Sequence, residues 1–128
     1  MRKQYYFRPS SGGLLAWDVD RLVALSKDFP VRQVPLRDIR ELEEPFSAQF
    51  DGQETWKTMV EHMRLIENAD LSYPIILSAE GRVMDGMHRV TKALLANRAT
   101  IAAVRFSTDP EPDYVDVDPN QLPYDEAV

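Results

Sequence analysis

The sequence predicts an α+β fold: a single small domain with a mixed sheet and flanking helices. Apolar residues recur at helical spacing in three segments, and short β-branched runs separate these segments. No internal repeat or heptad pattern is present, so the expected order is helix, strand, helix, strand, strand, helix, strand. The expected helices cover residues 18–29, 54–69 and 90–97, and the expected strands cover residues 31–36, 74–78, 82–85 and 100–106.

The first expected helix has a recognisable start and end. Asp18 is a typical N-cap residue, and Val19 and Leu22 give the helix an apolar side. Pro30 ends it because the residue before a proline avoids helical geometry. The strand that follows contains Pro35, which cannot donate a backbone hydrogen bond and therefore predicts the edge of a sheet.

The second expected helix carries a strong apolar stripe. We expect this stripe to face the core, and it consists of Trp56, Met59, Val60, Met63 and Ile66. Large aromatic residues dominate protein cores, so Trp17 and Trp56 are both predicted to be buried rather than to stack on nucleic-acid bases. His62 lies in this helix without metal-ligand partners at suitable spacing, and we expect it at the surface or boundary of the domain.

A short hairpin and a third helix follow. Residues 74–78 form an apolar run typical of a buried strand, residues 79–82 supply a turn, and residues 82–85 predict the returning strand. Asn97 suits the left-handed conformation that often ends a helix. Residues 100–106 then predict a final β-branched strand, which completes the expected sheet.

Composition indicates one globular domain. The chain has 128 residues, of which 44% are hydrophobic and 28% charged, so it can bury a real core. It has no cysteine, which excludes disulfides, thiol catalysis and cysteine-ligated metal centres. No apolar run has the length of a membrane span or of a signal peptide, and we therefore expect a cytoplasmic protein without membrane contact.

Negative charge is concentrated near the C-terminus. The formal net charge is −6, and the acidic residues that follow Arg105 without any Lys or Arg are Asp109, Glu111, Asp113, Asp116, Asp118, Asp125 and Glu126. The rest of the chain carries 15 bases against 14 acids, so it lacks the basic face of a general nucleic-acid binder. We expect a domain over residues 1–106 and an acidic, proline-rich extended tail over residues 107–128.

The tail has two interpretations. It is either disordered and solubilising, or it packs along a sheet edge or on a second subunit. A purely solvating tail has little use for apolar residues such as Tyr114, Val115 and Leu122. These residues therefore favour packing.

The most informative motif lies between the hairpin and the third helix, and it reads Asp85, Gly86, Met87, His88 and Arg89. A helix N-terminus offers unpaired backbone N–H groups and a partial positive charge. Gly86 lets the backbone approach a ligand closely, and Arg89 can hold an oxyanion with two hydrogen bonds. The motif therefore predicts a phosphate-binding site. The competing interpretation is a turn in which Asp85 caps the helix while His88 and Arg89 are solvated.

Four further side chains extend the phosphate hypothesis. Lys92 lies three residues after Arg89, so it either adds charge to a phosphate pocket or is a solvated lysine. Asp85, Glu41 and Glu44 are the candidates for a catalytic base or a magnesium ligand, against the alternative of a solvated acidic turn at residues 41–44. No cluster of histidines or cysteines predicts a dedicated metal site.

Two segments resemble the ParB/sulfiredoxin superfamily, in its ParB N-terminal-domain-like branch (the ParB-like nuclease domain). Residues 34–39, with the sequence Val-Pro-Leu-Arg-Asp-Ile, look like the opening strand and turn of that family. Residues 74–93, which include Gly-Arg-Val-Met-Asp-Gly-Met-His-Arg-Val, look like its hairpin, phosphate-gripping loop and following helix. The resemblance covers residues 31–106 and implies a nucleotide-binding fold.

The resemblance also implies site residues and a cofactor. Gly86, His88 and Arg89 would contact the phosphates of a nucleotide such as ATP, ADP or CTP, with Met87 in the same loop and Mg²⁺ as the accompanying ion. Activities in the superfamily include CTP binding and hydrolysis, ATP-dependent reduction of sulfinic acids and phosphoryl transfer to free serine. The reductase needs a cysteine where this chain has Met87, so that reaction is excluded. Partition proteins add a helix-turn-helix region, for which residues 107–128 leave no room, so we do not expect DNA binding.

The motif and the resemblance support three hypotheses about function. The first is the binding of a nucleotide or another phosphate-bearing small molecule. As an enzyme, such a protein would catalyse Mg²⁺-dependent phosphotransfer or nucleotide hydrolysis. The second is a non-catalytic protein-interaction or regulatory module that forms a homodimer. The third is nucleic-acid processing by a ParB-like nuclease, and it ranks last because the acidic tail would repel phosphates.

Overall fold

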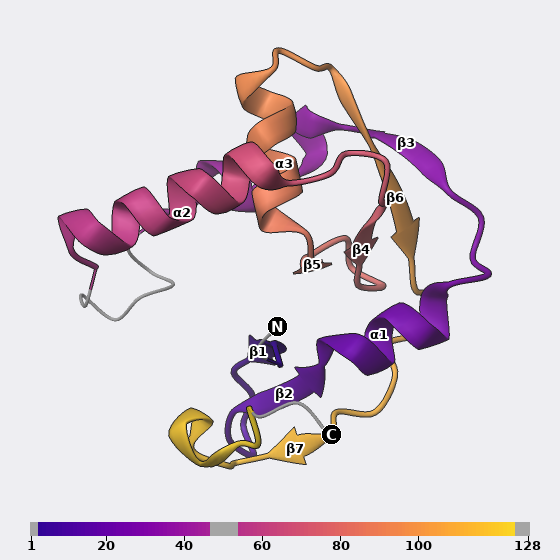
Figure 1. The fold of residues 1–128 in the computed structure, drawn as a ribbon. Coiled ribbons are helices and arrows are strands. Elements are labelled where there is room, and N and C mark those ends of the chain that lie inside the picture. The colour runs from indigo at the N-terminus through magenta and orange to yellow at the C-terminus, as the bar shows by residue number, and fades with distance from the viewer. Residues whose placement is uncertain (1–2, 47–53, 125–128) are drawn as a thin grey trace.

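The computed structural model describes residues 3–46 and 54–124. Their strands form two sheets (Figure 1). A four-stranded mixed sheet has the order β3 (Arg32–Pro35), β6 (Thr100–Arg105), β4 (Ile75–Leu77) and β5 (Val83–Asp85), and a three-stranded antiparallel sheet has the order β1 (Tyr5–Arg8), β2 (Leu15–Asp18) and β7 (Tyr114–Val115). The α-helices of the described residues are α1 (Val19–Ser26), α2 (Trp56–Asn68) and α3 (Met87–Leu95), and the fold is α+β, as predicted.

The four-stranded sheet contains all the strands that the sequence predicts. β6 pairs antiparallel with β3 and parallel with β4, and β4 forms an antiparallel hairpin with β5. β3 lies at the edge of the sheet, in agreement with the presence of Pro35. Alternation along β4 sends Ile75 and Leu77 to one face and Ile76 to the other, so the sheet is buried on both faces.

Two hydrophobic clusters cover these two faces. The first cluster packs the sheet against α3 and the 3₁₀ turns after β3, and its buried members are Leu36, Ile39, Ile75, Leu77, Val83, Val90, Ala93, Ile101 and Ala103. In the second cluster, Trp17 of β2 and Leu22 of α1 contact the opposite face, where Ile76, Met84 and Val104 lie. The second cluster therefore joins the two sheets into one body (Figure 1).

The expectation of one sheet is wrong because the two ends of the chain form a sheet of their own. β1 pairs with β2 over four residues, from Tyr5 with Asp18 to Arg8 with Leu15, and β7 adds two residues to the other edge of β2. Every residue of β1 is only half-buried. Such short strands show little alternation of polar and apolar residues, so the periodicity of the sequence does not reveal them.

The C-terminal segment packs on this three-stranded sheet, which is the alternative that its apolar residues favour. The indole Nε1–H of Trp17 donates to the carbonyl of Pro110 at 2.8 Å. The backbone N–H of Lys3 donates to the carbonyl of Tyr124 at 3.1 Å, and Leu122 is buried. These contacts connect the C-terminal segment to β2 and to the residues before β1, and Oδ1 of Asp109 also accepts the backbone N–H of Ala79, beside β4, at 2.8 Å.

The prediction that α2 buries its apolar stripe is wrong. Residues of that stripe with 42–84% of their surface exposed are Trp56, Met59, Val60 and Met63. The half-buried residues of α2 are Thr58, His62 and Ile66, which lie one turn apart, so Ile66 is the member of the predicted stripe that does turn toward the body of the protein. Trp17, by contrast, is buried as predicted.

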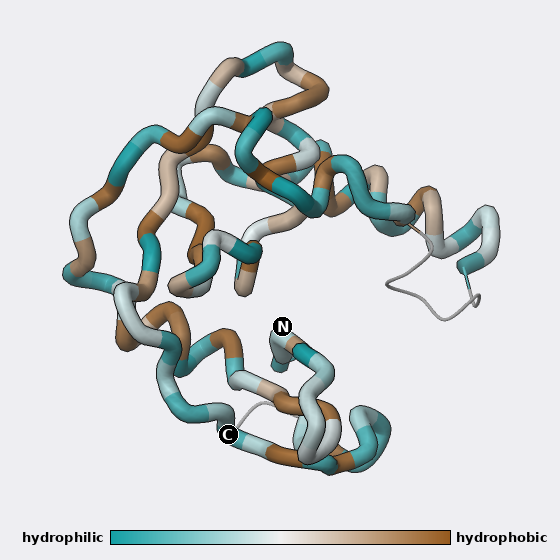
Figure 2. The backbone as a smooth tube through the Cα atoms, turned by 180° about the vertical axis from the view of Figure 1, so that it is seen from behind, coloured by the Kyte–Doolittle hydropathy of each residue, from teal (hydrophilic) through white to brown (hydrophobic). Residues whose placement is uncertain are grey.

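The position of α2 explains this result. The helix extends away from the four-stranded sheet and packs against α3, so only one side of it meets the body of the protein (Figure 1). Hydrophobic and hydrophilic segments follow one another along this helix (Figure 2). No helix in the described part of the chain, α2 included, is long and apolar enough to span a membrane.

Candidate functional site

Gly86 connects β5 to α3 and is the N-cap residue of that helix. Its φ of +113° lies in the left-handed region, which favours glycine. A Cβ atom at this position would lie 2.6 Å from Cγ2 of Ile75, so the turn packs directly on β4. α3 begins at Met87, earlier than the expected start at residue 90, and the whole motif therefore lies at the helix N-terminus.

The N-terminus of α3 has no side-chain cap among the described residues. The interpretation in which Asp85 caps the helix is therefore wrong. The N–H groups of the first turn have no intrahelical acceptors, and the helix dipole adds partial positive charge at the same point. This combination suits an anion.

Arg89 is held in one orientation beside this helix start. One of its terminal nitrogens donates to the carbonyls of Tyr73 and Pro74 at 3.1 and 2.8 Å, and the other donates to Oδ2 of Asp85 at 2.9 Å. The side chain is only 16% exposed. Two of the five guanidinium N–H donors have no partner among the described residues, so the group is oriented but not saturated.

His88 lies in the first turn of α3 and faces His62 of α2. Nδ1 of His62 and Nε2 of His88 are 3.1 Å apart, and the ring centroids are 5.3 Å apart. Burial and the neighbouring His62 ring lower the pKa of His88 below its usual value, Asp85 opposes this effect, and Arg89 adds to it. The lowered pKa favours the neutral form of the His88 imidazole.

The remaining residues of the predicted phosphate set have other contacts. Nζ of Lys92 donates to the carbonyls of Glu67 and Ala69 at 2.8 and 2.7 Å, so it caps the C-terminus of α2. Met87 packs against the hydrophobic cluster that underlies α3. The side chains of Lys92 and Met87 thus contribute to the packing of the helix pair that carries His88.

Glu41 and Glu44 lie at the other end of β5. Oε2 of Glu41 accepts the backbone N–H of Val83 at 2.6 Å, and the carboxylate is almost fully buried. Its Oε1 is buried too and has no partner among the described residues. Glu44 accepts two hydrogen bonds from Arg82 at 2.8 Å each, and that guanidinium lowers the pKa of Glu44. These carboxylates hold the hairpin, and Glu41 bonds to β5 itself.

The structure thus brings Asp85, Gly86, His88 and Arg89 together, and it adds His62, for which a surface or boundary position was expected. His62 lies one helical turn from Thr58 and from Ile66 on α2. This spacing is the one indication in the sequence that the three residues share a face of the helix. The described residues contain no group of three or more His, Cys, Asp or Glu residues that could hold a metal ion.

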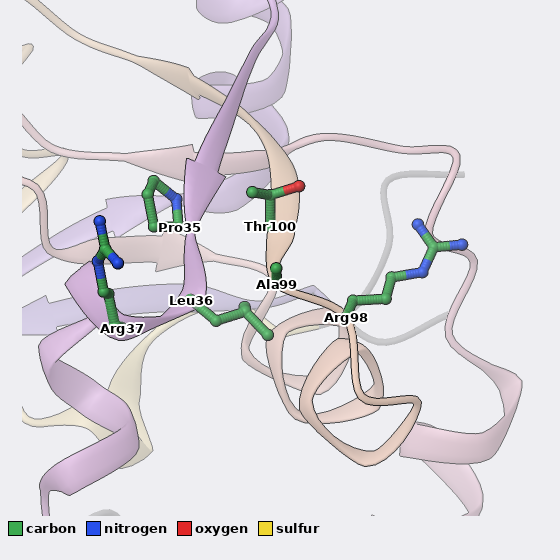
Figure 3. Close-up of a pocket in the computed structure, with 6 residues that line it drawn as sticks. All are labelled: Pro35, Leu36, Arg37, Arg98, Ala99 and Thr100. Carbon is green, nitrogen blue, oxygen red and sulfur yellow. The ribbon is translucent and has the colours of Figure 1, made fainter.

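A separate hollow of about 420 Å³ lies where β3 ends and β6 begins. Its lining residues are Pro35, Leu36, Arg37, Arg98, Ala99 and Thr100. Figure 3 shows Arg37 and Arg98 on opposite sides of it. None of the predicted site residues lines this hollow, so the sequence motif and the hollow are two different places.

Comparisons with known proteins yield no match to any family model, curated protein or solved structure. The described fold is a small α+β domain with an antiparallel and a mixed sheet, and membership of the ParB/sulfiredoxin superfamily remains a prediction from the motif.

Proposed function

We propose that this protein binds a phosphate-bearing small molecule at the N-terminus of α3. The observation that carries the proposal is the uncapped, glycine-led helix start with an oriented guanidinium beside it. A backbone N–H group, a helix dipole and a charged fork are the groups that proteins commonly combine around a phosphate.

The fixing of Arg89 is itself an argument for a ligand. Asp85 and two backbone carbonyls hold the guanidinium before any ligand arrives. A ligand therefore does not have to order a flexible arginine, which reduces the entropic cost of binding. The remaining N–H donors, on Nε and the nitrogen that bonds to Asp85, are the groups that we propose to contact phosphate oxygens.

The resemblance to the ParB/sulfiredoxin superfamily supports a nucleotide with Mg²⁺ as the ligand. It also supports phosphotransfer or nucleotide hydrolysis as the reaction that the protein would catalyse. Mg²⁺ usually binds phosphate oxygens together with one or two carboxylates. Asp85 directly precedes Gly86, so it is the carboxylate that we propose as a magnesium ligand or as a base, whereas Glu41 is less suited because it lies at the other end of β5, where its Oε2 accepts the Val83 N–H. Glu44 is less suited because Arg82 engages both of its oxygens.

A thermal-shift titration with ATP, ADP, CTP and GTP, each with and without Mg²⁺, tests the proposal. A ligand at about 100 times its Kd adds about 2.7 kcal/mol to the free energy of unfolding, which raises the Tm by several degrees. Arg89→Lys keeps the positive charge opposite Asp85 but loses the fork, and we expect it to weaken binding about tenfold or more, because a charged hydrogen bond contributes roughly 1.5–3 kcal/mol.

The matched control is Arg98→Lys, the same substitution at an exposed arginine of the separate hollow. It should bind as the wild type does. A Tm that responds to no nucleotide, or an Arg89→Lys variant that binds as well as Arg98→Lys, contradicts the assignment. With a binding nucleotide in hand, Mg²⁺-dependent release of inorganic phosphate distinguishes turnover from binding.

A second function, a non-catalytic interaction module that forms a homodimer, is supported by the exposed stripe of α2. Trp56 alone is 84% exposed, and isolated soluble domains rarely leave such a residue beside other apolar ones without a partner. Sedimentation velocity of the wild type and of Trp56→Gln tests this function. A dimer that dissociates in the variant, in a protein that responds to no nucleotide, would favour it over ligand binding.

A further inference from the structure

The two histidines of the chain are 26 residues apart in sequence and meet between α2 and α3. Their approaching atoms are Nδ1 of His62 and Nε2 of His88, at 3.1 Å. The edge of the Phe46 ring faces His62, with ring centroids 5.8 Å apart, which adds a packing contact to the hydrogen bond. Both rings are half-buried.

The contact between the two ring nitrogens permits only two arrangements for neutral rings. In one, Nδ1–H of His62 donates to Nε2 of His88, and His88 then carries its own proton on Nδ1. In the other, Nε2–H of His88 donates to His62, and Nδ1 of His88 carries a lone pair. The hydrogen bond made by one ring nitrogen thus decides what the other nitrogen of His88 offers to a ligand.

His88 occupies the first turn of α3, where an anion would bind. A lone pair on Nδ1 would repel that anion, whereas Nδ1–H would donate to it. The ionisable groups that act on His88 are His62 from α2, Asp85 from β5 and Arg89 from α3, and burial lowers the pKa of the ring, which favours its neutral form. A neutral ring contributes a hydrogen bond only in the correct tautomer.

We propose that His62 is a positioning residue of the phosphate site: it donates Nδ1–H to Nε2 of His88 and so fixes His88 as an Nδ1–H donor toward a bound phosphate group. This inference rests on the proposed function, because it names a further residue of the same site. His62 touches no ligand in this scheme and acts only through His88.

Two variants of His62 separate this role from simple packing. In His62→Asn, the side-chain amide lies where Nδ1 was, so it can still donate to His88, but the ring is lost. In His62→Phe, the ring that packs against Phe46 is kept, but the donor is lost. Arg64→Gln, an exposed position on the same helix, is the control.

The binding probe is inorganic sulfate, a dianion that does not titrate near neutral pH, added against sodium chloride of equal ionic strength. NMR spectra of the imidazole nitrogens follow the tautomers, and they are simple to assign because the chain has two histidines. We expect His88 to be in the Nδ1–H tautomer in the wild type, His62→Asn and Arg64→Gln, with similar Kd values for sulfate. In His62→Phe we expect mixed tautomers and about tenfold weaker binding.

Other results overturn the inference in distinguishable ways. If His62→Phe binds sulfate as the wild type does while His62→Asn is weakened, His62 contributes packing only. If His88 is in the Nε2–H tautomer in the wild type, the proposed direction of the hydrogen bond is wrong, although phosphate binding still stands. If the wild type binds neither sulfate nor any nucleotide, the proposed function fails and this inference fails with it.

Discussion

Arg82 and Arg89 flank β5 at its two ends, and both pair with carboxylates, yet their surroundings differ. Arg82 donates to both oxygens of Glu44, and Glu41 lies 3.6 Å from its Nε. Arg89 has one carboxylate contact, to Asp85, and its other contacts are backbone carbonyls. Two carboxylates lie against Arg82, so an anion there would meet excess negative charge, whereas Arg89 has one carboxylate partner and lies beside the N-terminus of α3.

The two arginines also differ in whether the backbone groups near them are hydrogen-bonded. Arg82 lies in a tight turn whose backbone is paired, with Ser78 N–H donating to the carbonyl of Arg82 at 2.8 Å. Arg89 lies beside Gly86 and an uncapped helix start. At the turn end of β5, the side chains therefore stabilise the hairpin. At the helix end, they are arranged as in an anion-binding site. The predictions below test this contrast.

The largest effect is expected for Gly86→Ala. The new Cβ would lie 2.6 Å from Cγ2 of Ile75, and φ of +113° strains any residue with a side chain. Strain and overpacking together should cost about 3 kcal/mol of the free energy of unfolding, as measured by urea denaturation. Gly12→Ala is the matched control, because nothing lies within 4 Å of the added atom. Equal stability of the two variants would show that the turn is not tightly packed.

The next largest effect is expected for Glu41→Ala at the turn end. The substitution removes the acceptor of the Val83 N–H, and an unsatisfied buried donor costs about 1–3 kcal/mol. Glu41→Gln keeps an acceptor and should cost less, which urea denaturation of both variants will measure. If Glu41→Ala is as stable as Glu41→Gln, the hydrogen bond to Val83 makes no measurable contribution to the free energy of unfolding.

His88 gives the helix end a pH dependence of stability. Its pKa is lowered in the folded state, mainly by burial, so the unfolded chain binds more protons than the folded protein as the pH falls through about 6.5. Stability should therefore fall as the pH decreases from neutral through about 6.5, and His88→Gln should remove part of that fall. Glu44 stays ionised throughout this range because its pKa is lowered. Identical pH profiles of urea midpoints for wild type and variant would contradict the assignment.

The smallest effect is expected for Glu44→Gln. Its ion pair with Arg82 is well formed, but the side chain of Glu44 is 46% exposed. Exposed ion pairs contribute below about 1 kcal/mol, and salt screens them. The change in urea midpoint should shrink further in high salt. A loss as large as that of Glu41→Ala would place the main clamp of the hairpin at Glu44 instead.

Local patterns in the sequence were sufficient to predict the strands of the four-stranded sheet, though not their order, and the junction at which α3 begins. The β-branched run at residues 100–106, the N-cap Asp18 and the glycine at the start of α3 are each recognisable within a few neighbouring residues. The α+β class follows from the order of these elements. The three-stranded sheet could not be predicted in this way, because its short strands come from the two ends of the chain.

The sequence by itself determined where glycine, histidine and arginine meet a helix N-terminus, since that placement depends on local conformation. Only the tertiary structure decided the roles of the side chains around it. It turned the apolar stripe of α2 outward and brought His62 to His88, because the packing of α2 on α3 selects which face is buried. It also paired Asp85 with Arg89 and used Lys92 to cap α2. Hydrogen bonds between distant elements depend on how those elements pack, and no local pattern contains that information.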